Sequence, residues 1–232
     1  MTPGSPHSDA PSAQPLRSDA ERNRERIIAA ARTVFARDGL NASMASVARE
    51  AGVGIATMFR RFPTKEELVD AVFSDRMQAY ADAVTAAMDD PDPWKGFVGY
   101  IEAACAMQAA DNGFADVLTM TFPTAKALER LRNEAYEGML GLIDRAKATG
   151  RLREDFDPSD LVLIHMANAG VVNATSGAAP DAWRRVVALL IQSLEAPARG
   201  TLPAPPGHEP LYKAMLRAGQ ATTSTPTPSK NN

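Results

Sequence analysis

The sequence predicts an all-α protein of about nine helices, with three short helices at the N-terminal end and a larger helical bundle after them. Apolar residues recur at helical spacing along most of the 232-residue chain. No segment alternates β-branched and polar residues long enough to indicate a strand. Of the 17 prolines, eleven fall within residues 1–16 and 197–232, and six lie where helices are expected to begin or end.

The first helices are bounded by short local signals. The first carries an apolar stripe that ends at Gly39 and consists of Ile27, Ile28, Ala31, Val34 and Phe35. After two further short helices, Thr64 is placed to cap a long fourth helix, with Glu66 and Glu67 in the first turn, where the helix dipole favours acids. The inward face of that helix is expected to carry Leu68, Val72 and Phe73.

Five later helices complete the predicted bundle. They are expected over residues 93–110, 113–120, 124–149, 158–176 and 180–195. The longest has apolar residues at regular helical spacing: Leu128, Leu131, Ala135, Met139, Leu142 and Ile143. Beyond them, the Pro-rich end is expected to be largely disordered, with a helical turn or two over Leu211–Ala218.

Residues 48–62 carry the most informative pattern of the chain. Two helices of about two turns each, joined by a glycine-containing turn, indicate a helix-turn-helix. Gly52 permits the sharp reversal, Val53 can fill the small core, and Ser43 can cap the second helix so that its amides face a phosphate. The third helix is expected to turn one set of side chains outward, namely Ile55, Ala56, Thr57, Arg60 and Arg61, and another inward, namely Met58 and Phe62.

The net charge of −3 argues against a protein that coats nucleic acid through bulk charge, but the charge is unevenly distributed. Residues 17–65 carry ten Lys or Arg and five Asp or Glu, whereas residues 66–232 carry 15 Lys or Arg and 22 Asp or Glu. A basic N-terminal module on an acidic body is expected of a protein that reads double-stranded DNA. The alternative is that the basic side chains are only solvated, because helix-turn-helix geometry also occurs in proteins without a DNA role.

Other classes of function have little support in the sequence. The single cysteine, Cys105, excludes an intramolecular disulfide, and three scattered histidines provide no metal motif, so no cofactor is expected. A cysteine-dependent enzyme using Cys105, His165 and Glu102 is the catalytic alternative, but no nucleophile elbow or Gly-rich phosphate loop supports it. No apolar stretch is long enough for a membrane span and no signal core is evident, so a cytoplasmic protein is expected.

The run from Arg26 to Val72 resembles the N-terminal domain of the TetR family of transcriptional regulators. The matching pieces are Ile27–Ala31, Val34-Phe35, Asp38-Gly39, Ser46–Ala48, Ala51–Val53 and Thr57–Leu68. The resemblance implies a homodimeric repressor released from DNA by a small molecule. Composition and resemblance together predict four parts: a disordered arm at 1–17, a helix-turn-helix DNA-binding domain at 18–65, a ligand-binding and dimerisation domain at 66–196 and a Pro-rich, largely disordered tail at 197–232.

The resemblance also assigns roles to single residues. Thr57 matches a position that contacts DNA, and Lys65 matches a phosphate-binding lysine. Ser43 matches a threonine that contacts the DNA backbone. Phe59 stands where a tyrosine hydroxyl often binds phosphate, and either Arg60 or Arg61 can offset that loss at a phosphate or a guanine edge. The expected DNA-binding set is Ser43, Gly54, Ile55, Ala56, Thr57, Phe59, Arg60, Arg61 and Lys65.

Three residues of this set also support a different function. Gly54 stands in place of a small polar residue and Ala56 in place of a common glycine, while Phe59 lacks the hydroxyl. These changes remove polar contacts to DNA. The alternative is therefore a helical, dimeric interaction or ligand-binding module whose DNA binding is weakened.

The C-terminal half is expected to supply the dimer interface and a pocket. Leu161–Val172 and Trp183–Leu194 are apolar on more than one face, and the resemblance places them in the dimer interface, although they also suit the core of a monomer. Polar His165 and Asn168 interrupt the first segment and Asn173 directly follows it, and these three must bond a ligand, the second subunit or the backbone. Candidate contacts for a mostly apolar effector, which suit a core equally well, are Trp94, Tyr100, Met107, Phe122, Met139, His165 and Asn168.

Overall fold

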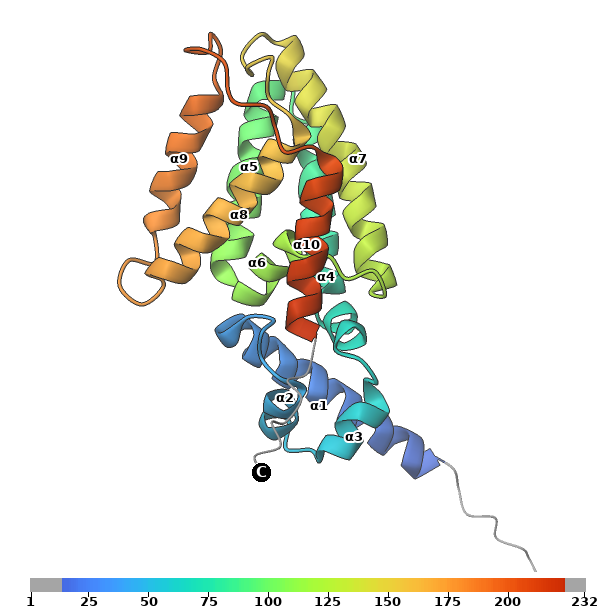
Figure 1. Ribbon diagram of the computed structural model, residues 1–232. Coiled ribbons are helices and arrows are strands. Elements are labelled where there is room, and N and C mark those ends of the chain that lie inside the picture. The colour runs from blue at the N-terminus through green and yellow to red at the C-terminus, as the bar shows by residue number, and fades with distance from the viewer. Residues whose placement is uncertain (1–13, 224–232) are drawn as a thin grey trace, which may run out of the picture.

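The computed structural model describes residues 14–223, in which ten α-helices and no β-strand are found (Figure 1). The first five are α1 (Gln14–Asp38), α2 (Met44–Glu50), α3 (Ile55–Arg61), α4 (Lys65–Met88) and α5 (Pro93–Ala110). The others are α6 (Asn112–Thr119), α7 (Lys126–Ala148), α8 (Pro158–Thr175), α9 (Ala182–Leu194) and α10 (His208–Thr223). The all-α prediction, with a helix-turn-helix before a larger bundle, is confirmed.

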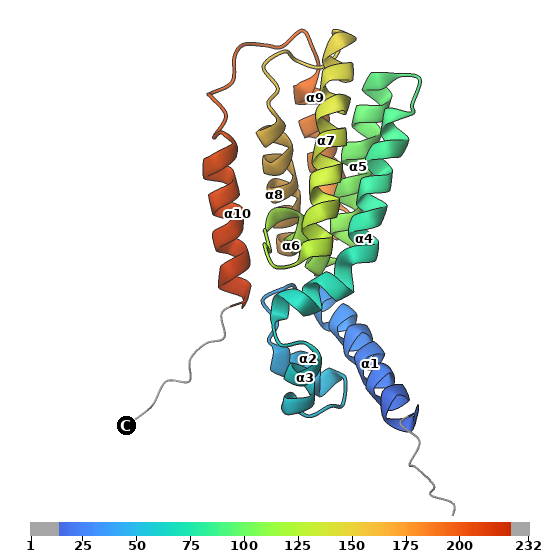
Figure 2. The same ribbon diagram turned by 90° about the vertical axis from the view of Figure 1, so that its right-hand side faces the viewer.

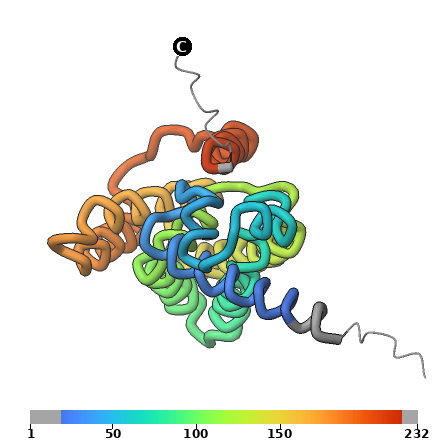
Figure 3. The backbone as a smooth tube through the Cα atoms, turned by 90° about the horizontal axis from the view of Figure 1, so that it is seen from below, coloured from blue at the N-terminus to red at the C-terminus, as the bar shows by residue number. Residues whose placement is uncertain are grey.

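The helices form a small head and a larger bundle. Helices α1–α3 make the head at one end of the molecule, and α4 runs from the head into the bundle of α4–α9 (Figure 1). Helix α10 lies outside that bundle, along the side where α7 and α8 run (Figures 2 and 3). No helix within residues 14–223 combines the length and the apolar character that crossing a membrane requires.

Local signals set the helix ends, as the sequence predicts. The Ser43 hydroxyl accepts the Ser46 N–H at 3.1 Å, and the Thr64 hydroxyl accepts the Glu67 N–H at 3.1 Å, so both residues are N-caps. Gly39 has φ +69°, in the left-handed region where glycine is favoured, and it ends α1.

Aromatic packing fixes the head to the bundle. The Phe73 ring of α4 lies 6.1 Å from that of Phe35 in α1 and 6.5 Å from that of Phe114 in α6, measured between centroids. Gly113 permits this close approach, because a Cβ there would lie 2.7 Å from the Phe73 side chain and 2.9 Å from that of Phe35. Helices α1, α4 and α6 therefore share one core.

The two ends of the chain differ from expectation. Instead of a turn or two over Leu211–Ala218, α10 is a 16-residue helix, so ten helices are present where about nine are expected. Its Leu211 and Met215, four residues apart, are buried, and the burial of this face stabilises a helix longer than the predicted turns. Helix α1 begins at Gln14, inside the arm predicted over 1–17. Residues 1–13 of that arm and 224–232 of the tail lie outside the described residues.

Candidate DNA-binding surface and ligand cavity

The turn between α2 and α3 is held by its own backbone and by α1. Gly52 has φ +61°, and the following Val53 N–H donates to the Ala48 carbonyl at 3.0 Å. From α1, the Arg26 guanidinium donates to the Ala51 carbonyl at 2.7 Å. A long-range hydrogen bond thus secures the turn that orients α3.

Helix α3 has a buried face and an exposed face. Met58 and Phe62 are buried, whereas Ile55 and Phe59 are 47% and 42% exposed, unusually high for large apolar side chains. Gly54, Ala56 and Arg60 are exposed as well, while Thr57 and Arg61 are half-buried. Eight of the nine expected DNA-contacting residues therefore reach the surface in part or in full, Ser43 at the start of α2 among them.

Arginines make the same end of the molecule basic. Arg24 and Arg49 are exposed, and so is Arg60, which contacts Thr57 Oγ1 at 3.4 Å. The Arg24 guanidinium stacks over the Phe62 ring, 5.6 Å from its centroid. The start of α1 and helix α3 both lie at the end of the head remote from the bundle (Figure 1). An exposed helix among these cations suits a DNA groove bordered by phosphates.

Lys65 is the one expected DNA-contacting residue that is buried, and its ammonium group is turned inward. Its Nζ donates to the carbonyl of Leu40 and, at 2.6 Å, to that of Thr222 at the end of α10. Burial lowers the Lys65 pKa from its usual 10.5 to about 8, and the nearby Asp116 carboxylate opposes that shift. The sequence contains no local signal of this burial, because it depends on where α10 packs.

A cavity of about 380 Å³ lies inside the C-terminal half. Its walls come from α4, α6, α7, α8 and α10 and from Thr121. The apolar lining includes Met77, Leu118, Met139, Leu161, Leu211 and Met215. Polar lining groups include Tyr80, Thr121, Glu129, Arg132 and His165. This size and mixture are typical of small-molecule sites.

Met139 and His165 are the two expected effector contacts that line the cavity; the other five lie elsewhere. The Asn168 amide donates to the Cys105 carbonyl at 3.2 Å and to Gln108 Oε1 at 2.9 Å, so its hydrogen bonds serve the core. Trp94 stacks under Arg151, with 5.2 Å between the guanidinium carbon and the ring centroid.

The remaining expected contacts also belong to the core. Tyr100 is buried and its hydroxyl hydrogen-bonds that of the cavity residue Tyr80. Phe122 is buried, and Met107 packs partly buried against the core. Asn173, the third polar residue of this segment, is exposed on α8.

Sequence reasoning missed the part of the cavity wall that α10 supplies. This part consists of Leu211, Tyr212 and Met215, together with Gly207 and His208 at the start of the helix. The four-residue spacing of Leu211 and Met215 is the one sequence signal that points to an apolar helix face here.

His165 and Thr121 line the cavity and have buried polar atoms without hydrogen-bond partners in the described structure, as does Arg132 at its Nε. Both imidazole nitrogens of His165 and the Thr121 hydroxyl are buried in this way. Burial lowers the His165 pKa to about 4, so its imidazole is neutral at neutral pH. A buried polar group without a hydrogen bond is costly, and a ligand can supply the missing bond.

Cys105 lacks the properties of a catalytic nucleophile. It is fully buried, and burial raises the pKa of its thiol to about 12, so the reactive thiolate does not form at neutral pH. Glu102, the carboxylate considered with it, is exposed on α5. Within residues 14–223, no group of His, Cys, Asp or Glu side chains is arranged to hold a metal ion.

Comparison with known proteins is consistent with both halves of this arrangement. Residues 27–72 match the bacterial regulatory proteins of the tetR family, and residues 92–196 match the C-terminal domain of SbtR-like transcriptional regulators. An HTH-type transcriptional regulator of Staphylococcus aureus strain USA300 is 41% identical over 54 residues, which are 23% of this chain. That match spans 29% of the length of the curated relative.

Two solved structures are among those to which this chain is similar. The fatty acid degradation regulator FadR of Bacillus halodurans has a TM-score of 0.54 at 19% identity, over 84% of this chain and all of that chain. A TetR transcription regulatory protein of Mycobacterium vanbaalenii has a TM-score of 0.44 at 28% identity, over 78% of this chain and all of that chain. At 19% identity the FadR match is informative about the fold alone.

The fold, the exposed recognition helix and the matched regions define a helix-turn-helix regulator. The chain belongs to the TetR family of transcriptional regulators. It is a DNA-binding transcriptional regulator and not an enzyme.

Proposed function

We propose that this regulator is a homodimeric repressor that binds a palindromic operator and leaves it when a small, mostly apolar effector enters the cavity. One observation carries the proposal. Helix α4 begins in the head at Lys65, and Met77 and Tyr80 of the same helix line the cavity. A rigid helix shared by two sites is a physical link through which each site can bias the other.

An uncovered apolar face on α8 and α9 supports the dimer. Leu163 on α8 and Leu189 on α9 are 42% and 52% exposed. On α8, the exposed Ala167, Gly170 and Ala174 continue the face at helical spacing from Leu163. Small residues allow a second pair of helices to approach closely. An apolar face of this kind fits a twofold interface in which the same surface of each subunit is buried.

On DNA, we assign direct contacts to α3 and its flanks. Ile55 and Phe59 suit apolar contacts with thymine methyl groups, and the Arg60 and Arg61 guanidinium groups suit phosphates or guanine edges. Ser43 and Thr57 add short polar contacts. A homodimer then predicts two half-sites separated by about one helical turn or more.

Selection of bound fragments from genomic DNA tests the proposal, followed by titration of the strongest fragment. We expect an inverted repeat, bound by two chains per site. The Arg60→Ala variant is expected to lower the affinity, with a salt slope about 0.9 smaller for each phosphate that is no longer neutralised. Arg37→Ala is a matched control, because Arg37 is exposed but paired with the adjacent Asp38 at 2.8 Å. Absence of bound DNA at several salt concentrations would instead favour the interaction-module alternative.

A further inference from the structure

One wall of the cavity is formed by α10, which lies outside both regions that match the family. The matched regions are residues 27–72 and 92–196, and α10 begins at His208. Tyr212 and Met215 of α10 line the cavity, and the His208 ring packs 6.1 Å from that of Tyr136 on α7. The Thr121 N–H donates to the Met215 carbonyl at 3.2 Å, so α10 is also joined to the bundle by a backbone hydrogen bond.

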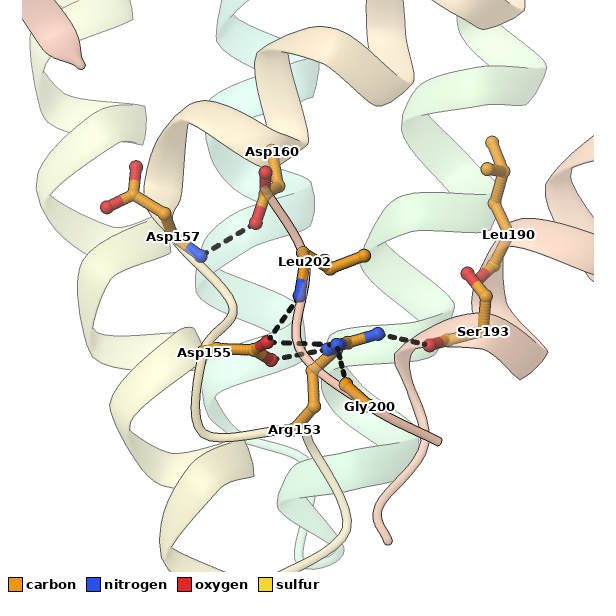
Figure 4. Close-up of polar contacts among 8 residues, drawn as sticks. All are labelled: Arg153, Asp155, Asp157, Asp160, Leu190, Ser193, Gly200 and Leu202. Carbon is orange, nitrogen blue, oxygen red and sulfur yellow. Dashed lines mark hydrogen bonds and ion pairs between the residues drawn. The ribbon is translucent and has the colours of Figure 1, made fainter. Parts of the chain in front are cut away.

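The linker that leads to α10 is anchored where it leaves α9 (Figure 4). The Arg153 guanidinium holds Asp155 and donates to the carbonyls of Ser193 and Gly200, each at 3.2 Å. Asp155 in turn accepts the Leu202 N–H at 3.3 Å. This ion pair keeps the pKa of Asp155 low, at about 2, so the anchor persists at neutral pH. Movement of α10 can therefore pivot on residues 203–207 and leave the rest of the linker in place.

The charges that line the cavity disfavour an anionic ligand. Arg132 lies 3.4 Å from Glu129 and donates to the carbonyls of Val117 and Met120, at 2.7 and 2.9 Å. Asp157 adds a second carboxylate, which accepts the Ser159 N–H at 2.9 Å as the cap of α8. A ligand carboxylate would thus meet two acids and a cation that is already paired.

We propose that the cavity binds an uncharged, largely apolar molecule bearing a hydroxyl or similar hydrogen-bonding group, and that α10 is its lid. The proposal rests on the proposed function and names the effector class. His165 as a neutral imidazole offers one donor and one acceptor, and the Thr121 hydroxyl offers both. Apolar walls bury the body of the molecule, and its hydroxyl supplies the bonds that these two residues lack.

Competition for a fluorescent probe tests the ligand class. The probe is N-phenyl-1-naphthylamine, which is uncharged, and the competitors are 1-decanol, decanoate and decylamine, which share one chain length. We expect 1-decanol to displace the probe at a concentration at least tenfold below that of either ion. Equal or better displacement by decanoate or decylamine, or failure of the probe to bind, would overturn the proposal.

The Thr121→Val variant tests the polar end of the site, because it removes the hydroxyl and keeps the shape. We expect 1-decanol to bind about three- to tenfold more weakly, since the variant cannot form the hydrogen bond. Thr175→Val is the control, because the Thr175 hydroxyl bonds the Val171 carbonyl at 2.8 Å and does not line the cavity. Equal losses of affinity in both variants would contradict the assignment.

The ligand class and the repression mechanism can fail separately. If 1-decanol binds as expected but does not release DNA, the proposed repression mechanism fails and the ligand class stands.

The other end of α10 carries a second inference, which rests on a different observation. Lys65 of the head donates to the Thr222 carbonyl at 2.6 Å and also to the Leu40 carbonyl. The Leu40 N–H donates to the Asp116 carboxylate of α6 at 2.6 Å. We infer that docked α10 withholds the Lys65 ammonium from DNA phosphate, so lid closure and DNA binding compete. An effector held under the lid then lowers the affinity for DNA.

Gly219→Ala tests this competition. A Cβ at Gly219 would lie 2.3 Å from the Thr121 carbonyl oxygen, so α10 must move away from the bundle. Gly99→Ala is the matched control, because its Cβ meets nothing within 4 Å on α5. We expect several-fold tighter DNA binding in Gly219→Ala and none of that gain when Lys65→Met is added.

Two results would overturn the competition. One is unchanged or weaker DNA binding in Gly219→Ala, and the other is a gain that persists with Lys65→Met. In either case the unaltered protein still binds its operator, which separates failure of this inference from failure of the proposed function.

Discussion

At the scale of single residues, two buried titratable groups share one physical cause. The surroundings of Lys65 and His165 exclude water, which disfavours the charged form and lowers both pKa values, to about 8 and about 4. Two carbonyl acceptors compensate Lys65 for its lost hydration, whereas the ring nitrogens of His165 have no hydrogen-bond partner. His165 is therefore neutral and available to a ligand, while Lys65 is committed to the contact between the head and α10.

His165 should make the stability depend on pH. Between pH 6.5 and about 4 the unfolded chain binds a proton at this residue and the folded chain does not, so stability falls as pH falls through that window. The loss of stability amounts to roughly 3 kcal/mol by pH 4. Urea unfolding at several pH values, compared with His165→Phe, measures it. Identical pH profiles for the two proteins would contradict the assignment.

At the scale of elements, glycines decide how closely helices approach. Gly113 at the start of α6 faces Phe73 and Phe35, and it lets α6 join the core that α1 and α4 share. Gly219 has the same role between α10 and the Thr121 carbonyl. Caps such as Ser43 and Thr64 set where helices begin, but these glycines set where helices lie.

Gly113→Ala should destabilise the protein by about 1–3 kcal/mol, because the added methyl overpacks the shared core of head and bundle. Gly99→Ala should be neutral or slightly stabilising, since it favours helix and meets no neighbour. Denaturant midpoints of the two variants measure the difference. Equal stabilities would show that the core relaxes around the methyl without cost.

At the scale of the whole molecule, exposed apolar side chains lie on the surfaces to which we assign DNA binding and dimerisation. The large ones within the described residues are Ile55, Phe59, Leu163, Leu189, Leu202 and Tyr212. Ile55 and Phe59 lie on α3 in the head, and Leu163 and Leu189 lie on α8 and α9 in the bundle. This distribution supports one surface for DNA and another for a second subunit.

Leu189→Glu should convert the proposed dimer into a monomer, because pairing would bury the new carboxylates opposite the apolar face. Leu202→Glu is the control, as Leu202 is 48% exposed but lies in the linker before α10. Sedimentation velocity distinguishes the two states. A Leu189→Glu protein that remains dimeric would place the interface elsewhere.

Much of the head could be predicted from the sequence, because its signals are local. The Ser43 and Thr64 caps, the Gly52 reversal and the inward Met58 and Phe62 each follow from neighbouring residues. The ligand site could not be predicted in this way. Most of its expected residues are apolar, and apolar residues look the same whether they fill a core or line a cavity, as Trp94 and Phe122 in the core show.

The sequence by itself determined the fold class, the helix-turn-helix and the outward face of α3, since helical periodicity and capping act over a few residues. Tertiary structure alone decided the position of α10, which lines the cavity and accepts a hydrogen bond from Lys65. The physical reason is that α10 is stabilised by contacts with residues up to 157 positions away, and neither composition nor periodicity records such contacts.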